Sequence, residues 1–162
     1  MIVVADTAPL NYLILIEQTG ILPELYGRVI IPEAVVQELR HPSAPPSVRS
    51  WMGEPPVWLE IQRVQCPKAD ATLEALDEGE REAIQLALEL HAHLLLIDEK
   101  AGRQAAVRHS LRVAGTLAVL EQAAEHGLLD FPKALKRLQK TNFRLSADIL
   151  EFFQTRNPKK KH

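Results

Sequence analysis

Two aspartates stand directly after short apolar runs of the sequence. Asp6 follows Ile2–Ala5, and Asp98 follows Leu94–Ile97. Runs of this length are typical of buried strands. In an open α/β sheet, ligands bind beyond the carboxyl ends of the strands, at the point where the strand order reverses. An aspartate after a strand can also simply cap the next helix, so the interpretation as a site depends on both residues meeting at one edge.

Two glutamates fall on the apolar faces of predicted helices. Helical periodicity puts Glu38 on the same face as Val35, and Glu80 on the same face as Ile84, whereas Glu82 falls on a polar face. A carboxylate on an apolar face costs free energy unless something compensates its charge. Glu38 and Glu80 therefore join the two aspartates as candidate site residues.

The four carboxylates predict a site for a hard divalent cation. Carboxylates that share a site raise one another's pKa values unless a cation lies among them. Mg²⁺ and Mn²⁺ prefer oxygen ligands and, when a few carboxylates hold them, also bind substrate phosphates. In such sites the ion activates water for the hydrolysis of a phosphodiester. Asp6, Glu38, Glu80 and Asp98 are thus the predicted metal ligands and catalytic residues.

The elements that must position these residues alternate between strands and helices. This alternation predicts an α/β fold, with a central parallel sheet between two layers of helices. The predicted strands cover residues 2–5, 28–31, 58–64, 94–97 and 111–114. The predicted helices cover residues 9–18, 32–40, 78–91, 99–109, 116–126, 132–140 and 146–154, with a short helix near 48–52. Thr7 is a candidate N-cap for the first helix.

Composition indicates a globular protein with an uneven charge distribution. The 162 residues are 46% hydrophobic and 25% charged, with a net charge of −2. Residues 1–100 hold 16 acidic and 7 basic side chains, whereas residues 101–162 hold 5 and 12. Such a split points to a polyanion partner, although uneven surface charge explains it as well. The chain has one cysteine, Cys66, and it has no apolar run near the roughly 20 residues of a membrane span. Both features favour a cytoplasmic location.

Five segments along the chain form an ordered set. They are residues 3–10 (VVADTAPL), 30–39 (IIPEAVVQEL), 76–84 (LDEGEREAI), 94–103 (LLLIDEKAGR) and 113–117 (VAGTL). This set resembles the PIN-domain family, in the company of VapC-like toxin ribonucleases. The resemblance covers about residues 1–125. It implies a three-layer α/β/α PIN-like fold and a metal-dependent endoribonuclease that hydrolyses RNA with Mg²⁺ or Mn²⁺.

The resemblance also assigns positions and partners. Asp6, Glu38, Glu80 and Asp98 match the family's four acidic positions, and Thr7 matches a hydroxyl residue that often follows the first. Proteins of this kind usually pair with an antitoxin protein and often form homodimers, so an antitoxin and a homodimer are expected partners, with no membrane association.

Two departures from the family pattern keep other functions open. The third acidic position is Glu80 rather than the more usual aspartate, and Lys100 stands where many members carry a further acid. Lys100 puts a second metal site in doubt and leaves as an alternative a catalytically weak or inactive PIN-like module that binds RNA or protein. A nuclease that acts on DNA is a third reading.

A polyanionic substrate needs basic side chains near the edge of the sheet that carries the predicted carboxylates. Lys100 and Arg103 follow Asp98 closely, and with Thr7 and Thr116 they form the predicted substrate-binding set. A second basic group lies on one face of the helix 132–140, where a solvated helix face is the simpler explanation. Its members are Lys133, Lys136, Arg137 and Lys140.

The expected organisation is one domain in three parts. Residues 1–126 form the PIN-like nuclease core, residues 127–156 a helical extension of it, and residues 157–162 a disordered basic tail. Four apolar residues of the N-terminal helices serve either the core or a dimer or antitoxin interface, and the core is the favoured role. They are Leu13, Ile14, Ile16 and Leu22.

Overall fold

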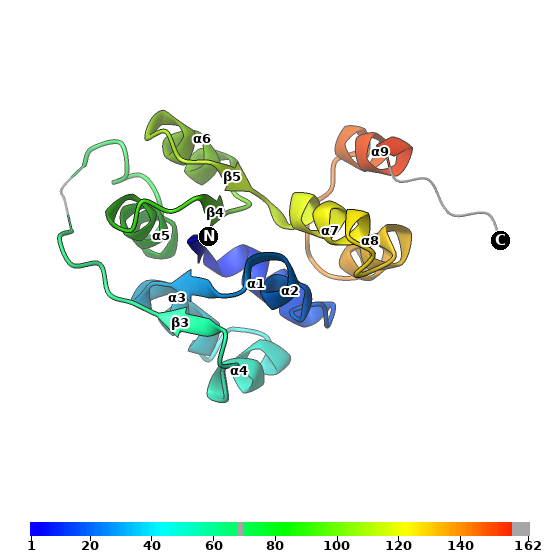
Figure 1. Cartoon of the computed structure of the whole chain (residues 1–162), viewed down its shortest axis with the longest axis horizontal. Helices are drawn as coiled ribbons and strands as arrows, with labels where there is room; N and C mark the ends of the chain where they lie inside the picture. The colour runs from blue at the N-terminus through cyan, green and yellow to red at the C-terminus, as the bar shows by residue number, and fades with distance from the viewer. Residues whose placement is uncertain (68–69, 157–162) are drawn as a thin grey trace.

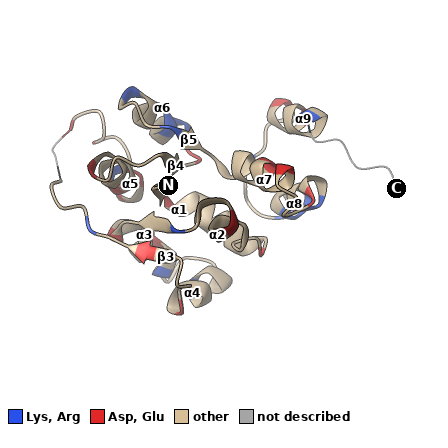
Figure 2. Cartoon of the chain, in the orientation of Figure 1, with Lys and Arg blue, Asp and Glu red and all other residues tan. Residues whose placement is uncertain are grey.

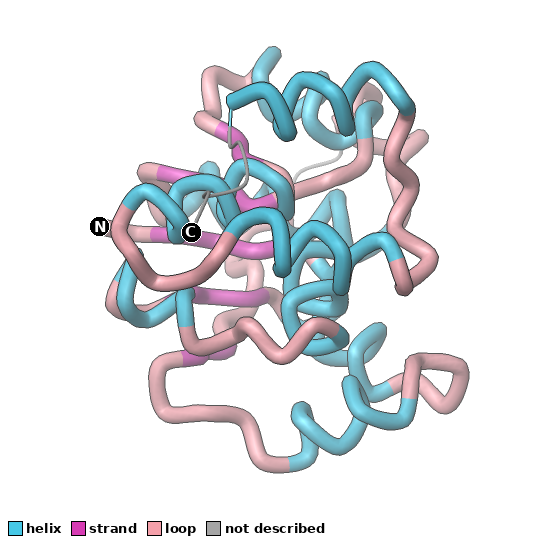
Figure 3. Tube along the Cα trace, turned by 90° about the vertical axis from the view of Figure 1, so that its right-hand side faces the viewer, coloured by secondary structure: helices cyan, strands magenta, loops and turns pink. Residues whose placement is uncertain are grey.

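The central element of the fold is a sheet of short strands. The structure is a computed structural model that describes residues 1–67 and 70–156. The strands are β1 (Val3–Ala5), β2 (Val29–Ile31), β3 (Leu59–Ile61), β4 (Leu94–Leu96) and β5 (Val113–Ala114). They lie in the order β3-β2-β1-β4-β5, and all neighbours are parallel. Figure 3 shows the strands side by side between helices.

Helices connect the strands and cover the sheet, as Figure 1 shows. They are α1 (Thr7–Leu15), α2 (Ile21–Tyr26), α3 (Glu33–Arg40), α4 (Pro46–Gly53), α5 (Glu78–Glu89), α6 (Lys100–Arg108), α7 (Thr116–Glu125), α8 (Phe131–Gln139) and α9 (Ala147–Arg156). The α/β class and the parallel sheet between two helical layers are confirmed.

The sheet is buried on both faces because side chains alternate along each strand. In β1, Val3 and Ala5 pack into a core that α1, α2, α3, α7 and α8 also form. Val4 faces the other way, into a second core with α5 and α6. Leu95 and Leu96 of β4 divide between the two cores in the same manner. The strands are apolar along their whole length because each face of the sheet packs against its own apolar core.

The strand order reverses between β1 and β4. From β1 the chain moves outward through β2 to β3, then returns to the far side of β1 to form β4 and β5. In the register of this pair, Ala5 lies opposite Leu96. Asp6, the next residue after β1, therefore lies at the sheet edge where α/β folds bind ligands, and Ile97, the next residue after β4, is buried in the second core.

Some local predictions were wrong. The predicted first helix is shorter, and α2, which the sequence reading missed, follows after Gly20. The strand predicted over residues 58–64 keeps only three residues, because β3 lies at the edge of the sheet and Ile61 is exposed. Thr7 does not cap α1; it is the first helical residue, and its hydroxyl serves another side chain.

The C-terminal helices lie beyond β5. α8 packs on α7 through Phe131, Ala134, Leu135 and Leu138, and its predicted basic stripe is exposed on the opposite face. The four apolar residues named for a core or an interface are buried, so they serve the core. The predicted tail, residues 157–162, lies outside the described residues.

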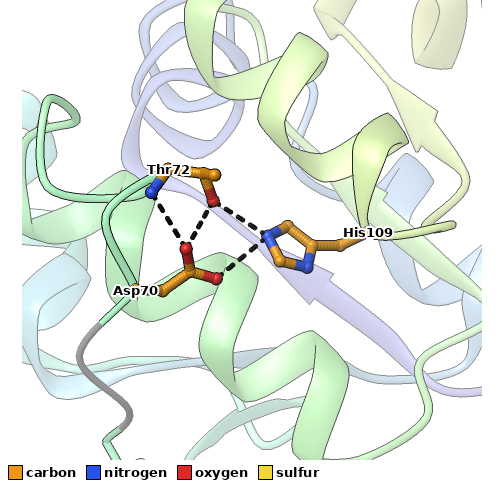
Figure 4. A network of polar contacts seen from close by, with 3 residues as sticks. All are labelled: Asp70, Thr72 and His109. Atoms are coloured by element: carbon orange, nitrogen blue, oxygen red, sulfur yellow. Dashed lines mark hydrogen bonds and ion pairs between the residues drawn. The ribbon is translucent and has the colours of Figure 1, made fainter.

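A polar network joins the loop before α5 to the end of α6 (Figure 4). His109 Nε2 lies 3.2 Å from both Asp70 Oδ2 and Thr72 Oγ1, and Asp70 Oδ1 accepts hydrogen bonds from the Thr72 amide and hydroxyl. Both partners meet the same ring nitrogen, so the trio lacks the relay of a catalytic triad, in which base and carboxylate use opposite nitrogens. Its role is to anchor the segment that leads into α5.

Candidate active site

Asp6 and Asp98 mark the carboxyl ends of the two central strands. The Asp6 amide donates to Leu96 O at 2.8 Å, which extends the pairing of β1 with β4. Asp6 occupies the N-cap position of α1 but makes no side-chain capping bond, and its side chain is only 3% exposed. Asp98 lies one residue before Glu99, the N-cap of α6. Neither aspartate caps the helix that follows it, so capping does not explain them.

Asp98 is held by the start of α7. The Thr116 amide donates to Asp98 Oδ1 and the Thr116 hydroxyl to Oδ2, both at 2.7 Å. Thr116 is fully buried, and a Cβ on Gly115 would stand 2.8 Å from Asp98 Oδ1. Asp98 therefore has a fixed orientation, and the glycine leaves it the space.

Glu38 reaches the site from α3, on the apolar face that periodicity predicted. Its carboxylate accepts hydrogen bonds from the Thr7 hydroxyl and from the Gly79 amide in the first turn of α5. A Cβ on Gly79 would lie 2.5 Å from Glu38 Oε1, so a larger residue here would displace the Glu38 carboxylate. Glu82, which was predicted to be solvated, is half-buried, and its carboxylate accepts a hydrogen bond from the Ala34 amide at 3.1 Å. Glu82 of α5 thus caps the start of α3, and Glu38 of α3 caps the start of α5.

Glu80 is the most enclosed of the glutamates in this group, with 7% exposure. The Glu80 amide donates to Asp77 Oδ1 at 2.8 Å, which makes Asp77 the N-cap of α5. The Glu80 carboxylate lies against Gly102 of α6, where a Cβ would collide with Oε2. Close packing of α6 against α5 thus fixes Glu80.

The site is strongly acidic, and its electrostatics show uncompensated charge. Burial, followed by the charges of Asp77, Glu38 and Asp98, raises the pKa of Asp6 to about 7. Burial and the neighbouring Asp77 raise the pKa of Glu80 to about 8. Burial also raises the pKa values of Glu38 and Asp98, against the hydrogen bonds from Thr7 and Thr116. These groups belong to one interacting cluster.

Asp77 is the member of this cluster that the sequence reading missed. It stands inside one of the resembling segments, but it precedes the helix, so the helix periodicity that singles out Glu80 does not include it. A usable signal was present: Asp77 is an N-cap residue three positions before Glu80, and the start of α5 had to face the same sheet edge as Asp6.

A family model described as a PIN domain matches residues 2–156. This chain belongs to the PIN-domain family. No curated protein and no solved structure gives a significant match. The family match extends through α8 and α9, beyond the first 125 residues that carried the resemblance.

PIN domains are typically nucleases that use divalent metal ions. The donor set of this PIN domain suits such an ion, because Asp6 Oδ1 and Glu80 Oε2 are buried and have no hydrogen-bond partner. Buried carboxylate oxygens without a partner are costly, and a cation compensates them. Within residues 1–67 and 70–156, however, no three His, Cys, Asp or Glu side chains are grouped closely enough to hold a metal ion as they stand.

The remaining predicted residues of the PIN domain fall into two kinds. The Thr7 hydroxyl donates to Glu38 and the Thr116 hydroxyl donates to Asp98, so both threonines orient acidic side chains. Lys100 and Arg103 are exposed on α6, and the charge of Arg103 lowers the pKa of Asp98. In Figure 2 the ribbon of α6 carries the blue segments that mark its lysine and arginines. In the described residues no helix is long and apolar enough to span a membrane.

Proposed function

We propose that this PIN domain is a divalent-metal-dependent endoribonuclease that hydrolyses RNA phosphodiester bonds with Mg²⁺ or Mn²⁺. The observation that carries the proposal is the pair of buried, unpartnered carboxylate oxygens on Asp6 and Glu80, at the reversal point of the sheet. Asp6, Glu80, Asp98 and Glu38 are the proposed ligands. A bound ion would supply charge neutralisation at the phosphate and a lowered pKa for a coordinated water.

The chain's own groups prepare the site in three ways. Thr116 holds both oxygens of Asp98, and Thr7 with the Gly79 amide holds Glu38. Burial of Asp6 and Glu80 lowers the local dielectric constant, which strengthens their interaction with a cation. Lys100 and Arg103 offer positive charge to the phosphates of an incoming strand.

The test is the cleavage of a labelled single-stranded RNA by purified protein at increasing Mn²⁺ or Mg²⁺ concentrations. Asp6→Asn removes charge at nearly constant volume, and we expect at least a hundred-fold loss of activity, the size typical for loss of an essential charged group. Glu54→Gln, at an exposed glutamate, is the matched control. Wild-type cleavage by a correctly folded Asp6→Asn protein would refute the site assignment. The same assay with single-stranded DNA distinguishes the two substrates.

A second function has specific support. Lys100 occupies a position where many PIN domains carry an acid, and the described residues contain no ready group of three metal ligands. Both observations favour a PIN-like module that binds RNA or protein with weak hydrolysis or none. RNA binding without cleavage at any metal concentration would support this alternative.

The broader setting follows from the same proposal. We propose that this PIN nuclease is the toxin of a toxin–antitoxin pair and acts as a homodimer in the reducing cytoplasm, where an exposed free thiol such as Cys66 persists. Co-expression with the product of the adjacent gene, followed by size-exclusion chromatography, tests both the antitoxin and the dimer.

A further inference from the structure

A cleft leads away from the acidic site along the β5 side of the sheet. Its volume is about 470 Å³, and Asp98 lies in its wall together with Gly115. The facing wall comes from the segment before α9 and from α9 itself. Because Asp98 belongs to both the cleft and the acidic cluster, a polymer held in the cleft lies next to the candidate active site.

Two arginines line this cleft. Arg103 is on α6, with Nη1 3.9 Å from the position of a Cβ on Gly115, and Arg144 precedes α9. The charge of Arg144 also acts on Tyr12, whose pKa is raised by burial and then by Asp98, so Arg144 faces the same region as Asp98. Among the described residues neither arginine forms an ion pair, which leaves both guanidinium groups for a ligand.

Aromatic rings form the other part of the lining. Phe143 packs edge-on against Tyr12, with ring centroids 4.9 Å apart, and Tyr12 donates to Asn142 Oδ1 at 2.9 Å. These contacts fasten the segment before α9 to α1. Phe143 is therefore held in place by contacts within the chain, without a ligand.

Phe152 is the most exposed ring of the cleft. It is 54% exposed, its neighbour Ile149 is 45% exposed, and both are large apolar side chains on α9. Phe152 contacts Phe153 edge-on at 5.2 Å, and Phe153 stacks on Phe131 of α8 at 6.0 Å. The guanidinium of Arg156, which pairs with Glu121, lies over the Phe152 ring at 4.9 Å from its centroid, so a base would stack on the part of the ring that Arg156 leaves exposed. Phe152 and Ile149 thus form an exposed apolar patch that shares the cleft with Arg103 and Arg144, and an apolar patch bordered by polar groups is typical of a binding surface.

We propose that this cleft binds an unstacked base of a single-stranded nucleic acid beside the scissile phosphodiester, with Phe152 as the stacking ring and Arg103 and Arg144 as phosphate contacts. Every base offers a π face, and rings combined with arginines are the usual means of holding single strands. A duplex keeps its bases inside the helix and cannot fill the cleft. The inference rests on the proposed nuclease function for the identity of the polymer.

The experiment measures binding without catalysis. Fluorescence anisotropy in EDTA gives the Kd of the full chain for a short single-stranded RNA and for DNA of the same sequence. We expect Phe152→Ala to bind about ten-fold more weakly, the effect of losing one base–ring stack. Phe152→Tyr keeps a ring and should restore wild-type affinity. Val57→Ala, at a fully exposed apolar residue outside the cleft, is the matched control.

Two further arms test the contacts themselves. A strand with abasic sites should bind wild type more weakly, and Phe152→Ala should weaken it no further, because the stacking partner is already gone. Arg144→Gln should reduce the slope of log Kd against log salt concentration by about one, the change expected for the loss of one phosphate contact. If RNA and DNA bind with equal affinity, the cleft recognises the base and the phosphate alone. If RNA binds more tightly, the cleft also contacts the 2′-hydroxyl.

The outcomes separate this inference from the nuclease proposal. If folded Phe152→Ala binds normal and abasic strands as wild type does, the base-binding role is refuted and the cleft serves another occupant, such as a protein segment. Loss of cleavage in Asp6→Asn would still stand in that case. If Asp6→Asn cleaves normally, the nuclease site is wrong, while the EDTA binding data judge the cleft on their own.

Discussion

At the scale of single residues, the site consists of carboxylates that the fold buries without neutralising. Asp6 is the clearest case, with 3% exposure and a pKa raised by burial to about 7 from an ordinary 3.8. A folded pKa above the unfolded one means that this group's contribution to stability is fully present below about pH 4. It is then lost as the pH rises through about 7.

Asp6→Asn should therefore stabilise the metal-free protein in a pH-dependent way. We expect a gain on the order of 4 kcal/mol near pH 8, because the variant has no buried charge, and almost none near pH 4. Urea unfolding in EDTA at both pH values measures this difference. Glu54→Gln, at an exposed position, should show no such dependence. A gain of equal size at both pH values would contradict the role of the buried charge.

Thr116 is a positioning residue in this site, since its hydroxyl donates to Asp98 Oδ2 at 2.7 Å. Thr116→Val keeps the shape and removes the donor, so we expect kcat to fall about ten-fold with little change in KM. The acidic limb of the pH–rate profile should move to higher pH, because the lost hydrogen bond had lowered the pKa of Asp98. Thr116→Ser should restore both. Failure of serine to restore activity would point to packing instead.

At the scale of elements, two glycines allow helices to approach the acidic groups. Gly102 of α6 lies against Glu80 and 2.7 Å from the Ile97 side chain, measured from the position of its missing Cβ. Gly79 of α5 lies equally close to Glu38. Helix propensity disfavours glycine at such positions, so close packing explains these residues better than local preference does.

Gly102→Ala should consequently destabilise the protein by about 1–3 kcal/mol, the usual cost of overpacking, and reduce cleavage by displacing Glu80. Gly53→Ala makes the same change at the end of α4, where nothing lies within 4 Å of the new Cβ. That control should be neutral or stabilising by up to about 1 kcal/mol. Thermal unfolding and the RNA assay measure both variants. Equal stability of the two variants would show that Glu80 moves aside freely.

At the scale of the whole molecule, metal binding should couple to stability. A cation that binds the folded state alone adds about 2.7 kcal/mol at a hundred-fold excess over its Kd, which corresponds to roughly 5–10 °C in Tm for a chain of this size. We expect Mn²⁺ to raise the Tm of the wild type and of Glu54→Gln, EDTA to reverse the change, and Asp6→Asn to abolish it. A shift that persists in Asp6→Asn would locate the ion elsewhere.

The sequence by itself determined the fold class and the inward-facing side of the helices that carry Glu38 and Glu80. Apolar strands alternating with amphipathic helices require a sheet covered on both faces, and the helix phase of Glu38 and Glu80 required them to face inward. These signals are local, because they depend on periodicities of two and 3.6 residues. The short α2 and the length of β3 escaped prediction, since tertiary packing and the sheet edge decide them.

Only the tertiary structure decided which residues meet. The order β3-β2-β1-β4-β5 makes β1 and β4 neighbours and brings Asp6 beside the end of β4, across about 90 residues of chain. It also revealed Asp77 in the cluster and the arrangement of Phe152 and Arg144 near Asp98. Contacts between distant segments depend on strand order and helix packing, which no local pattern encodes. The residue types and their helix phase can be read from the sequence, whereas the proximity of Asp6 to Asp77, Glu38 and Asp98 depends on the fold.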